Sequence, residues 1–275
     1  MTPVRYESHP ANNIISNVAA LLGDPNFPEI LINAPQGERI IRYQRLYQSY
    51  SRLGLSNPHD RPVAIDGLQR RLLRTMGCKG GLGVVDEVEP KGLLRRSLLW
   101  RRGSDMGTKG LTRIKFPIDR AMLAVPSWSW MAYTGSIDYL DLGFGRFDWE
   151  ELGSPWSGRA IGVSRTDDRQ PSMTLTAEAW LYDYDVTKYN PNAEIQREGQ
   201  LFFDNPGGSD QPELMSVVLG IEKGAKASRD KIHYLIVIKV TKTLDRDGRR
   251  ICERVGSGYL PGRRVTRSGF GVAIH

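Results

Sequence analysis

The chain has 275 residues, of which 40% are hydrophobic and 25% are charged, and it carries a net charge of +7. This composition is ordinary for a soluble globular protein with one large domain or two small ones. No apolar run approaches the length of a membrane span, and the N-terminus lacks the apolar core of a secretory signal. We therefore expect an intracellular, cytoplasmic protein without a membrane span.

The positive charge raises the question of nucleic-acid binding. Pairs of arginines are scattered at 70–71, 95–96, 101–102, 249–250 and 263–264. No helix-turn-helix, zinc-finger or RNP pattern accompanies them. We therefore expect a solvated basic surface and no nucleic-acid partner.

The N-terminal part of the chain has the periodicity of helices. Residues 1–37 predict an irregular lead-in with a short helix at Ile14–Leu22. From Glu38 large side chains recur at three- and four-residue steps and predict an amphipathic helix that ends before Gly54. The recurring residues are Ile40, Tyr43, Tyr47 and Tyr50. Asp60 is placed as an N-cap, with Pro62 in the first turn of a second helix that runs to about Met76. Its apolar side is formed by Val63, Leu68 and Leu72.

The centre, 77–122, is rich in loops and has one short predicted helix at Leu93–Trp100. Beyond Leu123 the pattern predicts strands at Ser172–Leu181, Leu214–Ile221, Ile232–Lys242 and Phe270–Ile274. Asp247-Gly248 is typical of a type I′ hairpin turn. The expected fold is α+β: an antiparallel β barrel or sandwich in the C-terminal two-thirds, with N-terminal helices packed on it. We expect one domain over 38–275, with a helical and loop part (38–122) and a β-rich part (123–275).

Several motifs of familiar enzymes fail in context. GCKGGLG (77–83) and the Tyr184-x-x-x-Lys188 spacing resemble a short-chain dehydrogenase, but the glycines follow a charged helix and the tyrosine leaves a strand. The histidines (His9, His59, His233 and His275) are isolated, and Cys78 and Cys252 have no partner at metal-ligand spacing. No G-x-S-x-G elbow or Walker loop is present. We expect reduced cysteines, no metal and no cofactor.

Four stretches, in order, resemble one family. They are YSRLGLSNPHDRPVAIDGL (50–68), GLLRRSLLWRR (92–102), VPSWSWMAYTGSI (125–137) and ICERVGSGYL (251–260). They are similar to blocks in the C-terminal region of fungal heterokaryon-incompatibility (HET) proteins, and the PSWSW block is the most specific. The resemblance spans about residues 46–275. The first block departs from the family's pattern at Leu53 and Val63.

The resemblance does not extend to the family's N-terminal signalling domain, which is related to TIR folds. The residues ahead of the YSR block show nothing like its A-L-S-Y-x-W-G motif. The cell-death activity assigned to that domain is therefore not expected here. The resemblance therefore relates this chain only to the family's C-terminal region.

The candidate site residues are mostly aromatic, and each of them could fill the core or line a pocket. The candidates for a pocket wall are Tyr47, Tyr50, Trp100, Trp128, Trp130, Tyr133, Trp149 and Trp156. Polar candidates are Asp60, which could instead cap a helix, and Ser127 and Ser129. If PSWSW is a strand, Trp128 and Trp130 share one face. Arg254 is expected in an ion pair at a strand edge.

Two functions remain open. The first is a cofactor-free cyclase or isomerase, such as a Diels–Alderase-type pericyclase of fungal secondary metabolism. It would hold a terpenoid- or polyketide-like substrate in an apolar pocket. The second is a non-enzymatic interaction or regulatory module derived from the incompatibility family. The sequence does not indicate an oligomeric state.

Overall fold

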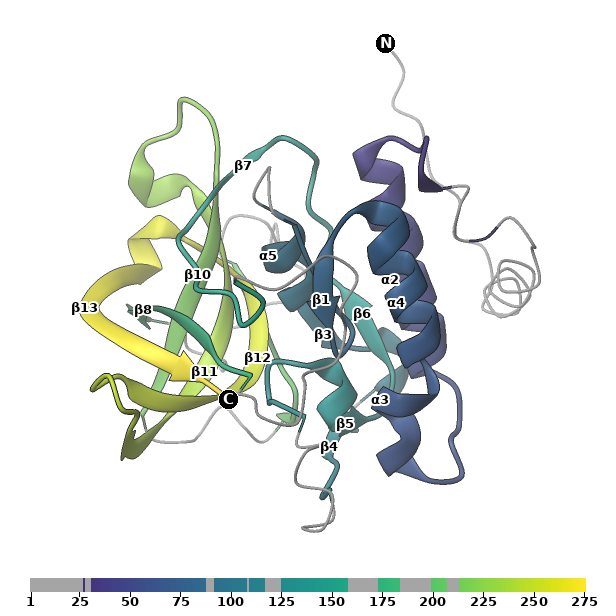
Figure 1. The fold of residues 1–275 in the computed structure, drawn as a ribbon. Helices are drawn as coiled ribbons and strands as arrows, with labels where there is room; N and C mark the ends of the chain where they lie inside the picture. Colours follow the sequence, from purple (N-terminus) through teal and green to yellow (C-terminus); the bar gives the residue numbers. More distant parts are fainter. Residues whose placement is uncertain are drawn as a thin grey trace.

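The computed structural model describes residues 27, 31–87, 92–107, 109–116, 125–157, 173–183, 199–206 and 213–275. Helices lie on one side of the molecule and a β barrel on the other (Figure 1). The predicted α+β class, with N-terminal helices beside a C-terminal barrel, is confirmed. The predicted helix at Ile14–Leu22 lies outside the described residues, as does the Tyr184-to-Lys188 spacing.

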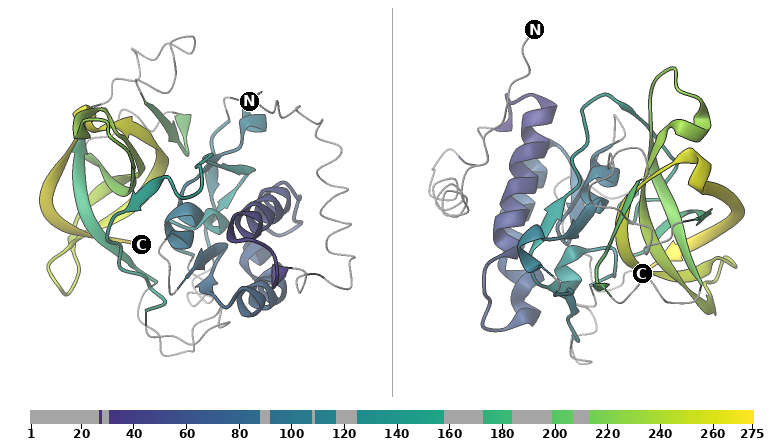
Figure 2. Two further views of the ribbon diagram at one scale, coloured as in Figure 1. Left: turned by 90° about the horizontal axis from the view of Figure 1, so that it is seen from above. Right: turned by 180° about the vertical axis from the view of Figure 1, so that it is seen from behind.

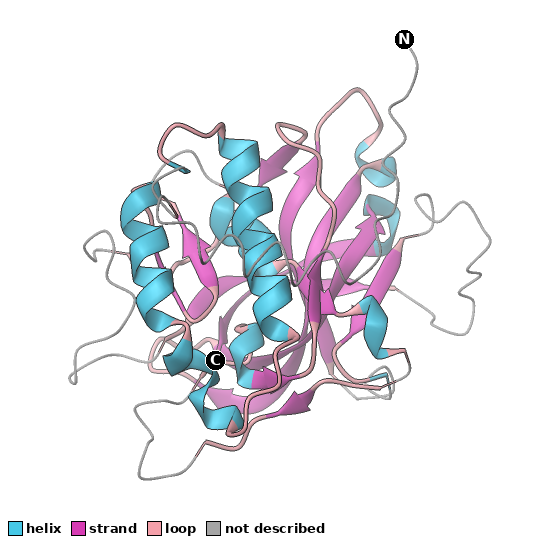
Figure 3. Ribbon diagram, turned by 90° about the vertical axis from the view of Figure 1, so that its right-hand side faces the viewer, coloured by secondary structure: helices cyan, strands magenta, loops and turns pink. Residues whose placement is uncertain are grey.

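Two long helices lie side by side over the strands of the N-terminal part (Figure 3). Helix α2 (Gln36–Ser51) buries Tyr43 and Tyr47, as the periodicity predicts. The second predicted helix is divided at Ile65 into α3 (Arg61–Ala64) and α4 (Asp66–Met76). Gly77 ends α4 in the left-handed conformation, with φ 63°, which glycine adopts without steric cost.

Two expectations for the start of this region are wrong. The Asp60 side chain makes no capping hydrogen bond and is exposed, whereas the Asn57 side chain accepts one from the backbone N–H of His59. Val63 does not join the apolar side, because it is 42% exposed. The short α3 turns this residue away from the core that α4 buries through Leu72.

The centre of the chain consists of short elements. The helix predicted at Leu93–Trp100 is α5 (Leu93–Leu98). The strands are β1 (Lys79–Gly81), β2 (Val84–Asp86), β3 (Trp100–Arg102), β4 (Thr112–Arg113), β5 (Tyr133–Thr134) and β6 (Ile137–Tyr139). They pair antiparallel as β1 with β2, β3 with β6, and β4 with β5. The 3-10 helices are η2 (Pro58–Asp60), η3 (Ser104–Met106), η5 (Trp130–Ala132), η8 (Ser228–Asp230) and η9 (Gly262–Arg264).

Seven strands of the described residues form the large sheet, and five of them close on themselves. These are β8 (Leu175–Tyr182), β10 (Leu214–Glu222), β11 (Ile232–Leu244), β12 (Arg250–Pro261) and β13 (Val265–Ile274). Strand β11 pairs with β10 and β12, β12 with β13, β13 with β8, and β8 returns to β10. Seen from above, these strands make a ring (Figure 2). Strands β7 (Phe147–Trp149) and β9 (Gln200–Phe203) extend the sheet at β10 and β12.

The closure depends on one parallel pairing, between β12 and β13. The other pairings of the ring are antiparallel. The hairpin predicted between β11 and β12 is confirmed, but its turn is not type I′. A type I′ turn needs positive φ at both central residues. Here Gly248 has φ 76°, Asp247 does not have a positive φ, and the Gly248 N–H bonds to Asp245 O at 3.2 Å.

Three apolar clusters hold the parts together. The first lies between the helices and the short strands and contains Tyr43, Tyr47 and Trp130. The second joins α5 and the segment before η5 to the barrel and contains Trp128 and Trp156. The third lies among the barrel strands, with buried residues that are Trp180, Leu201, Phe203, Val218, Leu235, Val237, Leu260 and Val265.

Candidate functional site

The tryptophans of the motif blocks are core residues. Trp100, Trp128, Trp130 and Trp156 are each 0% exposed. PSWSW is not a strand, because Pro126–Ser129 forms a turn and Trp130 begins η5. The two indoles therefore do not share a face. Trp130 enters the helical cluster, and Trp128 meets Trp156 edge to face in the second cluster, with ring centroids 5.7 Å apart.

Three of these indoles also have their N–H groups bonded to backbone carbonyls. Trp100 donates to Trp128 O (2.9 Å), Trp128 to Met173 O (3.1 Å) and Trp130 to Gly83 O (3.1 Å). Each bond ties the tryptophan to a distant segment of the chain. A buried indole needs such a partner, because an unpaired donor in the core is costly. These aromatic residues are thus occupied in holding the fold.

The remaining aromatic candidates differ in burial and in their contacts. Tyr47 is 0% exposed and lies 5.5 Å from the Trp130 ring, centroid to centroid. Tyr133 is buried and bonds to Arg254 O at 3.3 Å. Tyr50 and Trp149 are half-buried, and the Tyr50 hydroxyl donates to Arg61 O at 2.8 Å. The structure does not bring the aromatic candidates together around one cleft.

The two predicted polar serines are buried connectors. The hydroxyl of Ser127 bonds to His275 O and accepts the backbone N–H of Arg254 at 2.8 Å. The hydroxyl of Ser129 donates to Leu82 O at 2.6 Å and accepts the N–H of Met131 at 3.1 Å. Both side chains satisfy backbone groups of distant segments, so the PSWSW turn joins the helical part to the barrel.

Arg254 lies inside the molecule, so the expected strand-edge position is wrong. Its guanidinium pairs with Asp204 at 2.5 Å, donates to Trp100 O at 2.6 Å and lies 3.1 Å from the centroid of the Trp100 ring. The Ser257 hydroxyl donates to the same Trp100 oxygen at 2.6 Å. Burial raises the pKa of Asp204, which the adjacent guanidinium opposes. Arg254 therefore connects the LLW, PSWSW and ERVG blocks.

An open cleft forms where the YSR block meets the TGSI residues of the third block. Its volume is about 330 Å³. One wall is the end of α2 and the loop beyond it, and the other is the β5–β6 turn. The residues that line it are Ser51, Arg52, Leu53, Gly54, Leu55, Pro58, Arg61, Asp105, Thr134, Gly135 and Ser136. We refer to it as the Arg61 cleft.

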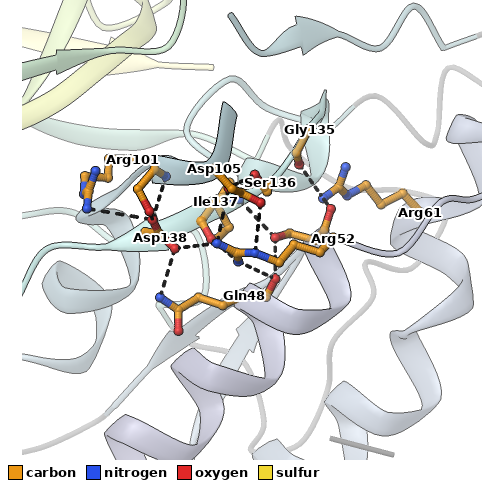
Figure 4. Close-up of polar contacts among 11 residues, drawn as sticks. Gln48, Arg52, Arg61, Arg101, Asp105, Gly135, Ser136, Ile137 and Asp138 are labelled. Carbon is orange, nitrogen blue, oxygen red and sulfur yellow. Dashed lines mark hydrogen bonds and ion pairs between the residues drawn. The ribbon is translucent and has the colours of Figure 1, made fainter. Parts of the chain in front are cut away.

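Arg52 organises one end of this cleft (Figure 4). Its guanidinium bonds to Asp138 at 2.8 Å, pairs with Asp105 at 3.3 Å and donates to Ile137 O at 2.9 Å. Burial alone would raise the pKa of Asp138, but the hydrogen bonds from Arg52 and from Ser104 outweigh it, so this pKa lies below its ordinary value. The carboxylate is therefore ionised at neutral pH and holds the end of α2 against β6.

Arg61 lies deeper in the same cleft. Its guanidinium donates to Tyr133 O at 2.7 Å and to Ser51 O at 3.0 Å. It also donates to Gly135 O at 3.1 Å (Figure 4). It also lies 5.1 Å from the centroid of the Trp130 ring, close enough for a cation–π contact. Burial lowers the pKa of Arg61 to about 10, so the group is charged at neutral pH.

Two further clefts are open to solvent. One, of about 200 Å³, runs between α2 and residues 139–144, and its walls include Ile41, Arg45 and Phe144. The other, of about 560 Å³, lies where β8 and β10 diverge, and Arg267 closes part of it by pairing with Glu150 and stacking on Trp180. Both have charged side chains in their walls.

Sequence reasoning did not single out Arg52, Arg61, Asp105, Ser136 or Asp138. The blocks themselves contained a clue to this cleft. Stretches that resemble one family are good candidates for neighbours in space. Arg52 and Arg61 belong to the first block, and Ser136 belongs to the third. What the sequence could not supply is the long-range pairing, because the Arg61–Gly135 bond joins residues 74 positions apart.

No family model, curated protein or solved structure matches the chain. In the part of the chain that the structure describes, no group of three or more His, Cys, Asp or Glu residues is arranged to hold a metal ion. No helix among the described residues is long and apolar enough to cross a membrane. Cys78 and Cys252 are both buried free thiols.

Proposed function

We propose that the chain is a non-enzymatic interaction module related to the C-terminal region of heterokaryon-incompatibility proteins, and that it binds a partner chain at the Arg61 cleft. One observation carries this proposal. The tryptophans and serines of PSWSW are buried and hydrogen-bonded to backbone groups, while residues of the first block and of the TGSI stretch line an open cleft. The blocks thus build a scaffold that presents this surface.

The chemistry of the cleft supports binding more than catalysis. A general acid, base or nucleophile must be able to reach the substrate with a proton or an electron pair available. Arg52, Asp105 and Ser136 are instead bonded to one another or to backbone. At the rim, Leu53 is 50% exposed. Protein interfaces combine apolar contacts with hydrogen bonds, so this arrangement is compatible with protein binding.

The cyclase hypothesis stays a prediction. Preorganised catalysis on an apolar substrate requires an enclosed, mostly apolar cavity. The three clefts described above are open and have arginine and carboxylate side chains in their walls. None of them is lined by Trp100, Trp128 or Trp130. An isobaric conversion in a metabolite extract, without added cofactor, would favour the cyclase over the interaction module.

A binding assay with one matched pair of variants tests the proposal. The protein is immobilised and exposed to purified chains that contain a complete HET-type architecture, with biolayer interferometry as the readout. Leu53→Asp should weaken binding at least tenfold, since it places a charge at the rim of the cleft. Leu244→Asp is the control, because Leu244 is similarly exposed, at 58%, but lies on the β11–β12 hairpin. Equal loss in both variants, or no binding by the unmodified protein, would overturn the proposal.

A further inference from the structure

Arg61 is a buried cation whose charge no carboxylate neutralises. It is only 5% exposed, and its three hydrogen bonds go to the carbonyl oxygens of Tyr133, Ser51 and Gly135. Among the described residues, it forms no ion pair, and its Nε has no hydrogen-bond partner. Burying a charge without a counterion is unfavourable, because the charge loses its hydration and carbonyl dipoles replace it only in part.

The neighbouring charges do not supply that counterion. Asp138 is shared between Arg52, at 2.8 Å, and Arg101, at 3.8 Å. Asp105 pairs with Arg52 and accepts the Ser136 hydroxyl at 2.6 Å. Among the labelled side chains of Figure 4, the carboxylates of Asp105 and Asp138 thus pair with Arg52 and Arg101, and Arg61 is left without a carboxylate partner. The cleft therefore has an excess positive charge at its base.

The shape of the cleft leaves room for an anion beside this charge. Its volume of about 330 Å³ exceeds that of a carboxylate group, and its wall includes the hydroxyl-bearing residues Thr134 and Ser136. Gly54 lies at its edge, and an added Cβ there would meet no atom within 4 Å. In a cleft with low-dielectric walls the attraction between Arg61 and an anion is stronger than at an open surface.

We propose that the Arg61 cleft binds a carboxylate, and that the natural ligand is an acidic side chain or C-terminus of the partner chain. This inference rests on the proposed interaction function for the source of the carboxylate. Binding neutralises the excess positive charge of the cleft. The partner segment then lies against Leu53 at the rim. Recognition would therefore depend on one buried charge rather than on the exposed basic residues of the surface.

The first test uses acetate as the probe. The ¹⁵Nε–¹H resonance of Arg61, assigned with Arg61→Lys, should shift on titration with sodium acetate at constant ionic strength set with chloride. Inorganic phosphate is titrated in parallel. A saturable shift with acetate that is at least threefold tighter than with phosphate supports the proposal. A shift with phosphate alone, or the same response to chloride, overturns the carboxylate assignment.

The second test avoids altering Arg61, which also holds three backbone segments in place. Gly54→Glu introduces a tethered carboxylate at the open edge of the cleft, and Gly54→Gln is its neutral match. The Glu variant should lose the acetate response by at least tenfold in apparent affinity, whereas the Gln variant should keep it. Equal acetate responses in the two variants would show that acetate binds elsewhere and would overturn the inference.

The outcome can be separated from that of the interaction function. If the partner binds and acetate competes with it in the unmodified protein, both proposals stand. Partner binding that acetate and Gly54→Glu do not affect would overturn the carboxylate site and leave the interaction function intact. Saturable acetate binding without any partner binding would overturn the interaction function and leave the carboxylate site intact.

Discussion

The Arg254–Asp204 pair offers the sharpest test of how the scaffold is held together. Its two side chains are 0% and 6% exposed, and their closest atoms are 2.5 Å apart. Asp204→Asn keeps the size of the side chain but removes the negative charge, leaving the Arg254 guanidinium buried with only hydrogen bonds to neutral groups. Breaking one partner of a buried pair typically costs about 3–5 kcal/mol of unfolding free energy. We expect a loss in the lower half of that range, because Arg254 keeps its bond to Trp100 O.

A surface pair on the same barrel is the matched control. Arg267 bonds to Glu150 at 2.7 Å and also pairs with Glu178, but its side chain is 51% exposed. Solvent screens such a pair, so that Arg267→Ala should cost no more than about 1 kcal/mol. The two variants thus compare a buried with an exposed ion pair: Asp204→Asn removes one carboxylate–guanidinium contact, and Arg267→Ala removes two.

Urea unfolding at pH 7, followed by tryptophan fluorescence, gives the loss in unfolding free energy for both variants. The slope against denaturant should remain unchanged, so that the midpoint reports stability alone. The double variant Asp204→Leu with Arg254→Met should recover part of the loss, since it leaves no buried charge. If Asp204→Asn and Arg267→Ala cost the same within 0.5 kcal/mol, the reasoning about a buried uncompensated charge is refuted.

Three further predictions concern titration, thiol reactivity and packing. The pKa of Asp138 is lower in the folded protein than in the unfolded chain, so its contribution to stability is complete above about pH 4. That contribution is lost as the pH falls through the folded pKa. The stability difference from Asp138→Asn should therefore shrink as the pH falls below about 4, and a constant difference contradicts the Arg52 pairing. Burial raises the pKa of both cysteine thiols to about 12. Neither should react with a disulfide reagent at pH 8 until urea unfolds the protein, and fast reaction in buffer would contradict their burial. Gly83→Ala should destabilise the protein by roughly 2–4 kcal/mol, since φ is +77° and the added Cβ would overlap the Trp130 indole. A loss below about 1 kcal/mol in a urea titration would contradict this close approach.

Local sequence was sufficient to predict the elements whose apolar residues recur regularly or form β-branched runs. The Tyr43 and Tyr47 spacing predicted α2, and the alternating and β-branched runs predicted β8, β10 and β11 to within a few residues. Helix α2 buries the face that its period marks. Strands β10 and β11 are buried on both sides over most of their length, as continuous apolar runs are, whereas Leu181 of β8 is 55% exposed. The barrel followed as one of two β architectures consistent with such strands, because the closing β8–β10 and parallel β12–β13 pairings have no local signature.

The errors arose where distant backbone groups decide the conformation. PSWSW alternates like a strand, yet Ser127 bonds to His275 and Ser129 to Leu82, which fixes a turn. Arg254 reads as a strand-edge charge until its partner Asp204, 50 residues away, is known. Aromatic residues occur in both cores and pockets, so the sequence left both interpretations of the candidate residues open. Only the contacts of each indole show whether it lies in a core or lines a pocket.

The closure of the barrel has a consequence for how the protein is made. Strand β13 pairs with both β8 and β12, and His275 accepts the hydrogen bonds of Ser127. A chain released before residue 265 would therefore leave two strand edges exposed and the PSWSW turn without its anchor. Unpaired edges are templates for association with other chains. Chains without β13 would thus be recognisable to chaperones and proteases by these exposed edges. The addition of β13 covers them.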